Sequence, residues 1–280
     1  MNQVAGDALE KLWGATQAVY DAGEALRIEQ DEVDITIDTD RPVGVVSVAD
    51  LHTGAESVDP KRVCGLVNSL GEVDGLYVAW NADLIEGAVM GNPESMKMIQ
   101  AVRVKWQRLM VLDLVSRVPN SIAVTCGQHE FFGYRAADFD FAEEVAKELE
   151  VPYLGTGGTI HALIGETQYS IGLWHKYRGQ SIYDATAGAK KLCAEHGPFD
   201  CTFVADKHAP AVSSEIRHGG LRRIFARGGT ASLNCEYAKS LGYTDSTFNF
   251  PLVIFWPHER KMWAWDDLRE GLEYLKFLRQ

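Results

Sequence analysis

Residues 43–52 read VGVVSVADLH, and this stretch decides the fold. Positions 43 to 48 form a short run of almost wholly apolar, β-branched side chains, which is typical of a strand covered on both faces. Asp50 and His52 follow directly after the end of this run. The stretch therefore predicts a buried strand that delivers a carboxylate and an imidazole to one edge of its sheet.

The same unit recurs further along the chain. The expected order is a helix at 59–71, a strand at 76–80, a helix at 93–117 and a strand at 122–125. The two strands deliver Asp83 and the run Gln128-His129-Glu130. Alternation of strand and helix predicts a largely parallel sheet, and ligands bind such sheets at the carboxyl ends of the strands. All three polar motifs are expected at that edge.

The second half of the chain has a different texture, with short strands separated by glycine-rich turns. Strands are expected at 159–164, 168–174, 201–205, 222–227 and 252–256, with helices at 139–149 and 185–196. This pattern predicts a second sheet packed on the first and hence an α/β fold, a four-layer α/β/β/α sandwich of two mixed sheets flanked by helices. We expect a single domain over residues 1–280, with helices at 6–30 and 266–278 as additions.

Composition limits the class of protein. With 280 residues and 46% hydrophobic residues, the chain can bury a large core. The N-terminus lacks the pattern of a signal peptide, and no apolar run approaches the about 20 residues that span a bilayer. We therefore expect an intracellular, cytoplasmic protein with no membrane partner. The five cysteines are scattered without CxxC spacing, so reduced thiols are expected. A formal charge of -12 disfavours broad binding of long nucleic acids.

Metal-seeking side chains follow five of the expected strands. They are Asp50 and His52, Asp83, Gln128-His129-Glu130, His175, and Asp206-Lys207-His208. A phosphate ester needs its charge neutralised and a water made nucleophilic, and one or two divalent ions held by Asp and His do both. Each residue alone has a simpler interpretation, since Asp at a strand end often caps the next helix. Their joint placement indicates a metal-dependent phosphoesterase.

The series resembles the calcineurin-like metallophosphoesterase superfamily, whose pattern is D-x-H, G-D-x-x-D/E, G-N-H-E/D, H and G-H-x-H. The resemblance covers roughly residues 43 to 256, and the motifs agree in order and in strand placement. The stretch His175-Lys176-Tyr177-Arg178-Gly179, followed by 188–191, resembles a branch found in phages and bacteria, which allows a phage-encoded protein. Any one motif is common, whereas five in order are specific.

The resemblance implies two metal sites and a set of roles. One ion would be held by Asp50, His52, Asp83 and His208, and a second by Asp83, Gln128, His175 and Asp206. Asp83 would bridge the ions, because a carboxylate has two oxygens to share. His129 would donate a proton to the leaving alkoxide or stabilise charge on the phosphoryl oxygens, with Glu130 orienting it. Glu86 falls at the family's second acidic position.

The chain departs from the family at the second metal site. Gln128 stands where the family has Asn, and Asp206 where it has the first His of G-H-x-H; Ala82 and Ala205 replace glycines. An anionic oxygen favours harder ions, so Mn2+ is expected first, with Mg2+, Fe and Zn2+ as alternatives. Three accounts remain open: a second site rebuilt for another ion, one filled only with substrate, or one that is lost.

The function expected is hydrolysis of phosphodiesters by metal-activated water. The substrate would be a nucleotide, another phosphorylated small molecule or a short nucleic-acid end, contacted by Lys207, Tyr177 and Arg178. Residues 131–134 are expected to wall the site as a loop that Gly133 allows to move. The alternative is a catalytically weakened protein that sequesters a phosphorylated ligand. Nucleoside hydrolase-like and amidohydrolase-like enzymes are disfavoured, because they place their ligands differently along the chain.

Overall fold

The computed structural model describes residues 3–26, 29–89, 99–137, 139–179, 181, 183–216, 220–233 and 246–280. A five-stranded mixed sheet has the strand order β11-β10-β2-β3-β4. Its strands are β2 (Val43–Val48), β3 (Leu76–Asn81), β4 (Ser121–Thr125), β10 (Leu252–Phe255) and β11 (Met262–Trp265). β2, β3 and β4 run parallel, as the alternation of strand and helix predicts. Every residue of β2 is buried, which agrees with its unbroken apolar run.

A six-stranded mixed sheet has the strand order β1-β5-β6-β7-β9-β8. Its strands are β1 (Glu32–Ile37), β5 (Gly157–Ile164), β6 (Thr167–Trp174), β7 (Cys201–Val204), β8 (Ala211–Ile216) and β9 (Arg222–Arg227). β6, β7 and β9 run parallel to one another, while β5 and β8 are antiparallel to their neighbours β6 and β9. β6 and β7 therefore end at the same edge of this sheet.

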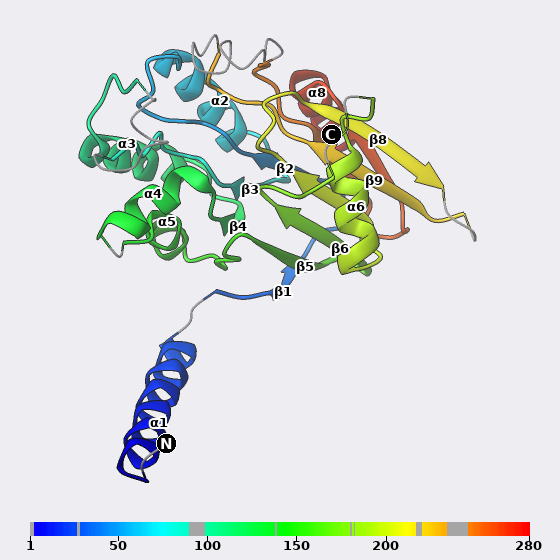
Figure 1. The fold of residues 1–280 in the computed structure, drawn as a ribbon. Helices are drawn as coiled ribbons and strands as arrows, with labels where there is room; N and C mark the ends of the chain where they lie inside the picture. The colour runs from blue at the N-terminus through cyan, green and yellow to red at the C-terminus, as the bar shows by residue number, and fades with distance from the viewer. Residues whose placement is uncertain are drawn as a thin grey trace.

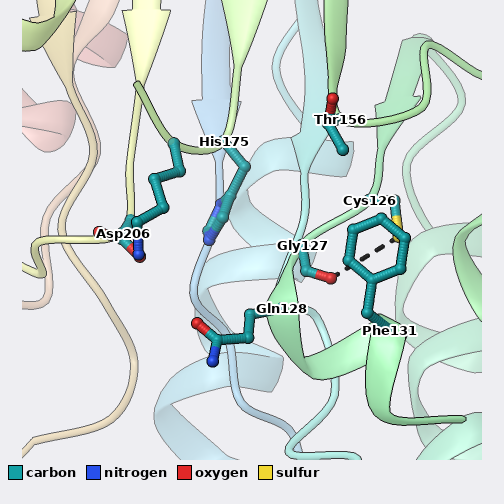
Figure 2. A pocket seen from close by; sticks show the side chains of 8 residues that line it. Cys126, Gly127, Gln128, Phe131, Thr156, His175 and Asp206 are labelled. Carbon is teal, nitrogen blue, oxygen red and sulfur yellow. Dashed lines mark hydrogen bonds and ion pairs between the residues drawn. The ribbon is translucent and has the colours of Figure 1, made fainter. Parts of the chain in front are cut away.

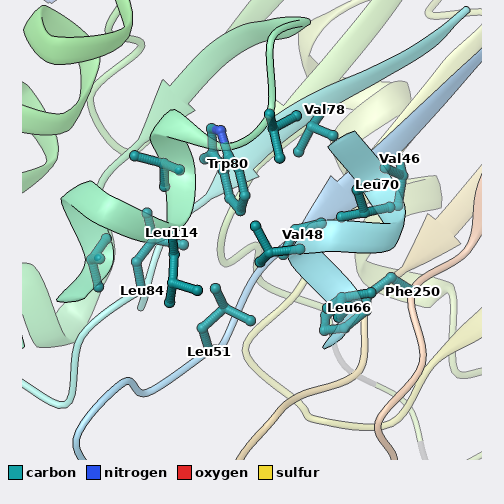
Figure 3. Packing of buried hydrophobic residues seen from close by; sticks show 14 of the residues in the cluster. Val46, Val48, Leu51, Leu66, Leu70, Val78, Trp80, Leu84, Leu114 and Phe250 are labelled. Carbon is teal, nitrogen blue, oxygen red and sulfur yellow. The ribbon is translucent and has the colours of Figure 1, made fainter. Parts of the chain in front are cut away.

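Helices cover the outer faces of the two sheets (Figure 1). The bounds are α2 (Pro60–Gly71), α3 (Val104–Ser116), α4 (Gln128–Ala137), α5 (Phe141–Leu149), α6 (Ala187–His196) and α8 (Leu268–Leu278). α2, α3, α5 and α8 pack their apolar faces on the five-stranded sheet in one core, which includes Trp80 and Leu114 (Figure 3). α6 packs on the six-stranded sheet through Leu192 and Cys193.

A third cluster of apolar residues fills the space between the sheets. It contains Val45 and Val253 from the five-stranded sheet and Ile171, Phe203 and Ile224 from the six-stranded sheet. Side chains alternate along β2, because successive residues of a strand point to opposite faces: Val43 and Val45 join this cluster and Val46 and Val48 join the helix-covered core. The predicted four-layer α/β/β/α order is confirmed.

Several element bounds differ from the prediction. The third helix begins at Val104, and residues 93–98 of its predicted range lie outside the described residues. Residues 128–137, which include the predicted loop at 131–134, form the helix α4, so the prediction of a loop there was wrong. β8 and β11 were not predicted. α8 begins at Leu268 because the side chain of Asp267 accepts a hydrogen bond from the Glu270 amide and caps the helix.

The helix α1 (Gln3–Leu26) projects away from the two sheets, at the blue end of the chain in Figure 1. Every residue from 10 to 25 is exposed, including Leu12, Trp13 and Val19. No helix in the described part of the chain combines the length and apolar character needed to cross a membrane. The four cysteines among the described residues are free thiols, as predicted, and Cys235 lies outside them.

Candidate metal centre

The loops that carry the predicted ligands share an unusual backbone. φ is positive at Asp50 (52°), His52 (45°), Asp83 (49°), Asp206 (70°) and His208 (57°). Left-handed backbone costs roughly 1–2 kcal/mol at a residue other than glycine. Among the described residues, the only other non-glycine positions with positive φ are Ala82, in the same loop as Asp83, and Glu150. Backbone strain is thus concentrated where the loops after β2, β3 and β7 meet, as is common at functional sites.

Asp50, His52 and His208 converge on one point. Asp50 is fully buried, and its Oδ1 lies 3.3 Å from His208 Nε2 and 3.7 Å from His52 Nε2. The two Nε2 atoms are 3.2 Å apart. Asp50 Oδ1 has no hydrogen-bond partner among the described residues. A buried anionic oxygen without a donor, faced by two imidazole nitrogens, is the arrangement expected of ligands around a cation.

Two of the imidazoles are held by a second set of groups. His175 donates its Nδ1 proton to the carbonyl oxygen of Asn81 at 2.9 Å, and His52 Nδ1 lies 3.1 Å from Glu86 Oε2. Such partners leave Nε2 free to bind a metal. The sequence pointed to Glu86 only as an acidic family position, and it gave no signal for Asn81, whose backbone carbonyl makes the contact.

Asp83 lies between these groups. Its Oδ2 is 3.0 Å from His175 Nε2, and its Oδ1 accepts a hydrogen bond from the backbone N–H of His129 at 3.0 Å. His175 Nε2 also lies 3.8 Å from Asp50 Oδ1. Three groups of residues could each hold a metal ion, because within each group the ligand atoms lie within 4.8 Å of one another. The groups are Asp50, His52 and His208; His52, Asp83 and His129; and Asp50, Asp83 and His175.

The electrostatics of the cluster favour positive charge at its centre. Burial lowers the pKa of His175, but Asp83 and Asp50 outweigh burial and raise it to about 10. Burial likewise lowers the pKa of His52, while Asp50 and Glu86 raise it well above its usual value. Burial raises the pKa of Asp50 and of Asp83, but His175 and the other imidazoles hold both well below the usual range. Asp50 and Asp83 therefore stay anionic, and His52 and His175 gain protons, whose place a divalent ion would take.

Glu130 does not orient His129, so that prediction is corrected. Its Oε1 accepts the N–H of Leu84 at 2.8 Å, and its Oε2 accepts those of Asp83 and Gly127 at 2.9 and 3.0 Å. Burial and the charge of Asp83 raise its pKa to about 7. Because α4 begins at Gln128, Glu130 faces the loops after β3 and β4 and fixes them. The ring of His129 is instead set by the carbonyl oxygen of Glu86, 2.6 Å from Nδ1.

The predicted second metal set is not assembled in the same way. Asp206 belongs to none of the three groups formed by the described residues. Its Oδ1 lies 2.9 Å from Lys176 Nζ, and its Oδ2 lies 3.1 Å from Lys207 Nζ. Its backbone N–H donates to Asp50 Oδ2 at 3.1 Å, which joins the loops after β2 and β7. The first ligand set is thus assembled, whereas in the second set Asp83 and His175 form a group with Asp50 and not with Asp206.

A cavity of about 440 Å³ lies beside the cluster. In Figure 2, Asp206, His175 and Gln128 stand on one side, with Thr156, Cys126 and Phe131 on the other. The rings of Phe132 and His129 are tilted against each other, with centroids 5.2 Å apart. The side chain of Tyr134 lies outside the described residues. The wall predicted from residues 131–134 therefore comes from Phe131, on a helix.

Two of the three predicted substrate contacts, Tyr177 and Arg178, contact Glu195 of α6. Tyr177 donates a hydrogen bond from its hydroxyl to Glu195 Oε2 at 2.5 Å, and Arg178 Nη2 lies 3.1 Å from the same oxygen. Neither residue lines the cavity, whereas their neighbour Lys176 does. Sequence reasoning did not single out Lys176, although its place directly after His175 was a usable signal.

Comparison with known proteins concerns the fold. No family model matches the chain, and no curated protein matches it. Vacuolar Protein Sorting 29 from Cryptosporidium parvum is 16% identical, with 83% of this chain and 94% of that chain covered and a TM-score of 0.43. The calcineurin-like phosphoesterase YfkN from Bacillus subtilis is 11% identical, with 86% and 99% covered and a TM-score of 0.44.

A metallophosphoesterase from Sphaerobacter thermophilus is 14% identical, with 83% of this chain and 92% of that chain covered and a TM-score of 0.36. Likeness at this level does not carry activity from one protein to another, so the chemistry must be argued from the side chains of the cluster. The two mixed sheets flanked by helices agree with the four-layer α/β/β/α fold that the sequence predicts.

Proposed function

We propose that the chain is a metal-dependent phosphoesterase. The observation that carries this proposal is the convergence of Asp50 Oδ1, His52 Nε2 and His208 Nε2, with Asp83 beside them. A divalent ion held by these four residues would neutralise phosphoryl charge and make a water nucleophilic near neutral pH. The mixed carboxylate and imidazole set suits Mn2+ first, with Mg2+, Fe and Zn2+ as alternatives.

His129 is the candidate for proton exchange with the substrate. Its Nδ1 is engaged by the Glu86 carbonyl oxygen, and its Nε2 has no hydrogen-bond partner among the described residues. Contact between the His129 and Phe132 rings supports the imidazole from one side. In this orientation Nε2 would serve the leaving oxygen or hold a phosphoryl oxygen, which is the role that general acid–base catalysis requires.

The proposed substrate is a phosphodiester of a nucleotide or of a short nucleic-acid end. A cavity of about 440 Å³ falls in the size range of small-ligand sites. Phe131 offers an apolar wall for a base or sugar, and Lys176 offers a cation for a phosphate. The formal charge of -12 disfavours a long polyanion, because the whole surface would repel it.

Hydrolysis of bis-p-nitrophenyl phosphate in Mn2+ tests the proposal. Asp83→Asn removes one charge at the centre of the cluster, and we expect it to lower the rate by at least about 100-fold. Asp34→Asn is the matched control, since Asp34 is exposed on β1. If Asp83→Asn and the wild-type chain hydrolysed the diester at equal rates, the proposed role of Asp83 would be refuted.

A binding protein without turnover is the second candidate. It is favoured by one observation, the ion pairs that Lys176 and Lys207 make with Asp206, where a family enzyme would hold its second ion. Such a protein would retain a phosphorylated ligand in Mn2+ without releasing product. Equilibrium dialysis with a nucleotide, followed by analysis of the recovered ligand, separates the two functions.

A further inference from the structure

Asp206 has its charge balanced by the chain itself. The Asp206 side chain is only 12% exposed, and its Oδ1 accepts a hydrogen bond from Lys176 Nζ at 2.9 Å. Its Oδ2 has no hydrogen-bond partner among the described residues but forms an ion pair with Lys207 Nζ at 3.1 Å. A carboxylate at this depth is stable only when it is paired. Two ammonium groups already supply more positive charge than one carboxylate carries, so Asp206 has little need of a metal ion.

Lys176 differs from Lys207 in its position. Lys176 lines the 440 Å³ cavity together with Gln128, His175 and Asp206, the three residues predicted to hold the second ion with Asp83. Lys207 does not line that cavity. A positive charge therefore stands among the second-site residues, and it is carried by a side chain rather than by an ion.

The charges favour one ion over two. An ion held by Asp50 and Asp83 would have its two positive charges matched by the two carboxylates. Lys176 and Lys207 together leave one positive charge in excess of Asp206, which is available to a substrate phosphate. A second divalent ion next to both ammonium groups would add like charges at short range, a repulsion that solvent screens in part because the Lys176 side chain is 58% exposed.

We propose that the Lys176 ammonium takes the place of the second divalent ion, so that the chain binds one metal and contacts the substrate phosphate through Lys176. This inference rests on the proposed phosphoesterase function. It accounts for the carboxylate at position 206, because Asp206 pairs with Lys176 and a histidine there would not, while Asp50, His52, Asp83 and His208 keep the family pattern.

Counting the bound ions tests the inference without relying on activity. The full chain is loaded with Mn2+, freed of unbound ion by gel filtration, and examined by elemental analysis and electron paramagnetic resonance. We expect one Mn2+ per chain with the six-line signal of an isolated ion. Two ions per chain with an exchange-coupled signal would overturn the inference and leave the proposed function standing. A chain that bound no ion and showed no turnover would refute both.

Variants of Lys176 test the phosphate contact. Lys176→Met keeps the length of the side chain and removes its charge, and we expect kcat/KM for the diester to fall about 100-fold. Lys176→Arg should recover part of that loss, and Lys276→Met, on the exposed face of α8, should cause none. Unchanged kcat/KM in a folded Lys176→Met protein that still binds Mn2+ would contradict the contact.

Discussion

His52 couples metal binding to protons. Burial lowers the pKa of this first-site ligand, but Asp50 and Glu86 outweigh burial and raise it well above its usual value, so the protonated imidazole is favoured near neutral pH in the metal-free protein. A metal that binds Nε2 must displace this proton, so binding weakens as the pH falls. Between pH 6.5 and 8.5 we expect the Mn2+ affinity to rise about tenfold per pH unit for each proton displaced. Calorimetry in two buffers of different ionisation enthalpy counts these protons; release of none would contradict the prediction.

Gly127 keeps the space that Asp83 needs. A Cβ at this position would lie 2.2 Å from Asp83 Oδ1 and 2.9 Å from Ala82 Cβ. Gly127→Ala should therefore displace the carboxylate and weaken Mn2+ binding by about tenfold or more. Gly133→Ala is the matched control, because its nearest neighbour is the carbonyl oxygen of Phe139 at 3.6 Å and alanine favours a helix. Equal Mn2+ affinities for the two variants, measured by titration calorimetry, would show that the space is not required.

At the residue scale, the sequence predicted the ligands that directly follow strands. It missed the groups whose roles depend on contacts between distant parts of the chain. Asp50, His52 and Asp83 could be found because each follows a buried strand directly. The carbonyl oxygen of Asn81 carries no side-chain signal, and the pairing of Lys176 with Asp206 joins residues 30 positions apart. Residue type and order identify ligands, whereas orientation and charge pairing require the assembled loops.

At the element scale, the strands of the two cores were predictable because their residues are apolar. β8 was missed because its pattern AVSSEI is half polar and none of its residues is fully buried. α4 was missed because its sequence QHEFFGYRAA lacks an apolar stripe at helical spacing. Its first turn is held by contacts outside the helix, above all those of Glu130, and not by an amphipathic face.

Through Glu130, α4 holds the loops after β3 and β4 in place. Three backbone N–H groups in two loops donate to its carboxylate, and Glu130→Ala would leave them without acceptors. We expect a loss of about 3 kcal/mol in the free energy of unfolding, measured with urea at pH 5, against no change for exposed Glu148→Ala on α5. The difference in unfolding free energy between the wild-type chain and Glu130→Ala should become smaller as the pH rises from 4.5 towards about 7. In this range the unfolded wild-type chain releases the Glu130 proton while the folded chain retains it, so the wild-type chain loses stability and the variant does not. A loss that grew with pH would contradict this account.

At the scale of the whole molecule, the metal centre depends on both sheets. Asp50, Asp83 and His129 come from the five-stranded sheet side, while His175 and His208 follow β6 and β7 of the six-stranded sheet. Backbone contacts such as Ala205 N to His175 O at 2.7 Å and Ala231 N to Asp50 O at 3.0 Å join the loops. The apolar layer between the sheets therefore helps to set the distances in the cluster, because it holds together the two sheets that carry the ligands.

α1 stands outside this arrangement, and its removal tests how much of the molecule the site needs. Leu12, Trp13 and Val19 are 62%, 72% and 74% exposed, so they add little burial to the fold. Deletion of residues 1–27 should leave the melting temperature within about 2 °C of the full chain and leave Mn2+ binding unchanged. Leu275→Ala, in the buried face of α8, should instead cost about 2–5 kcal/mol and lower the melting temperature by several degrees or more. A comparable drop for the truncated chain in calorimetry would mean that α1 packs on the body in solution.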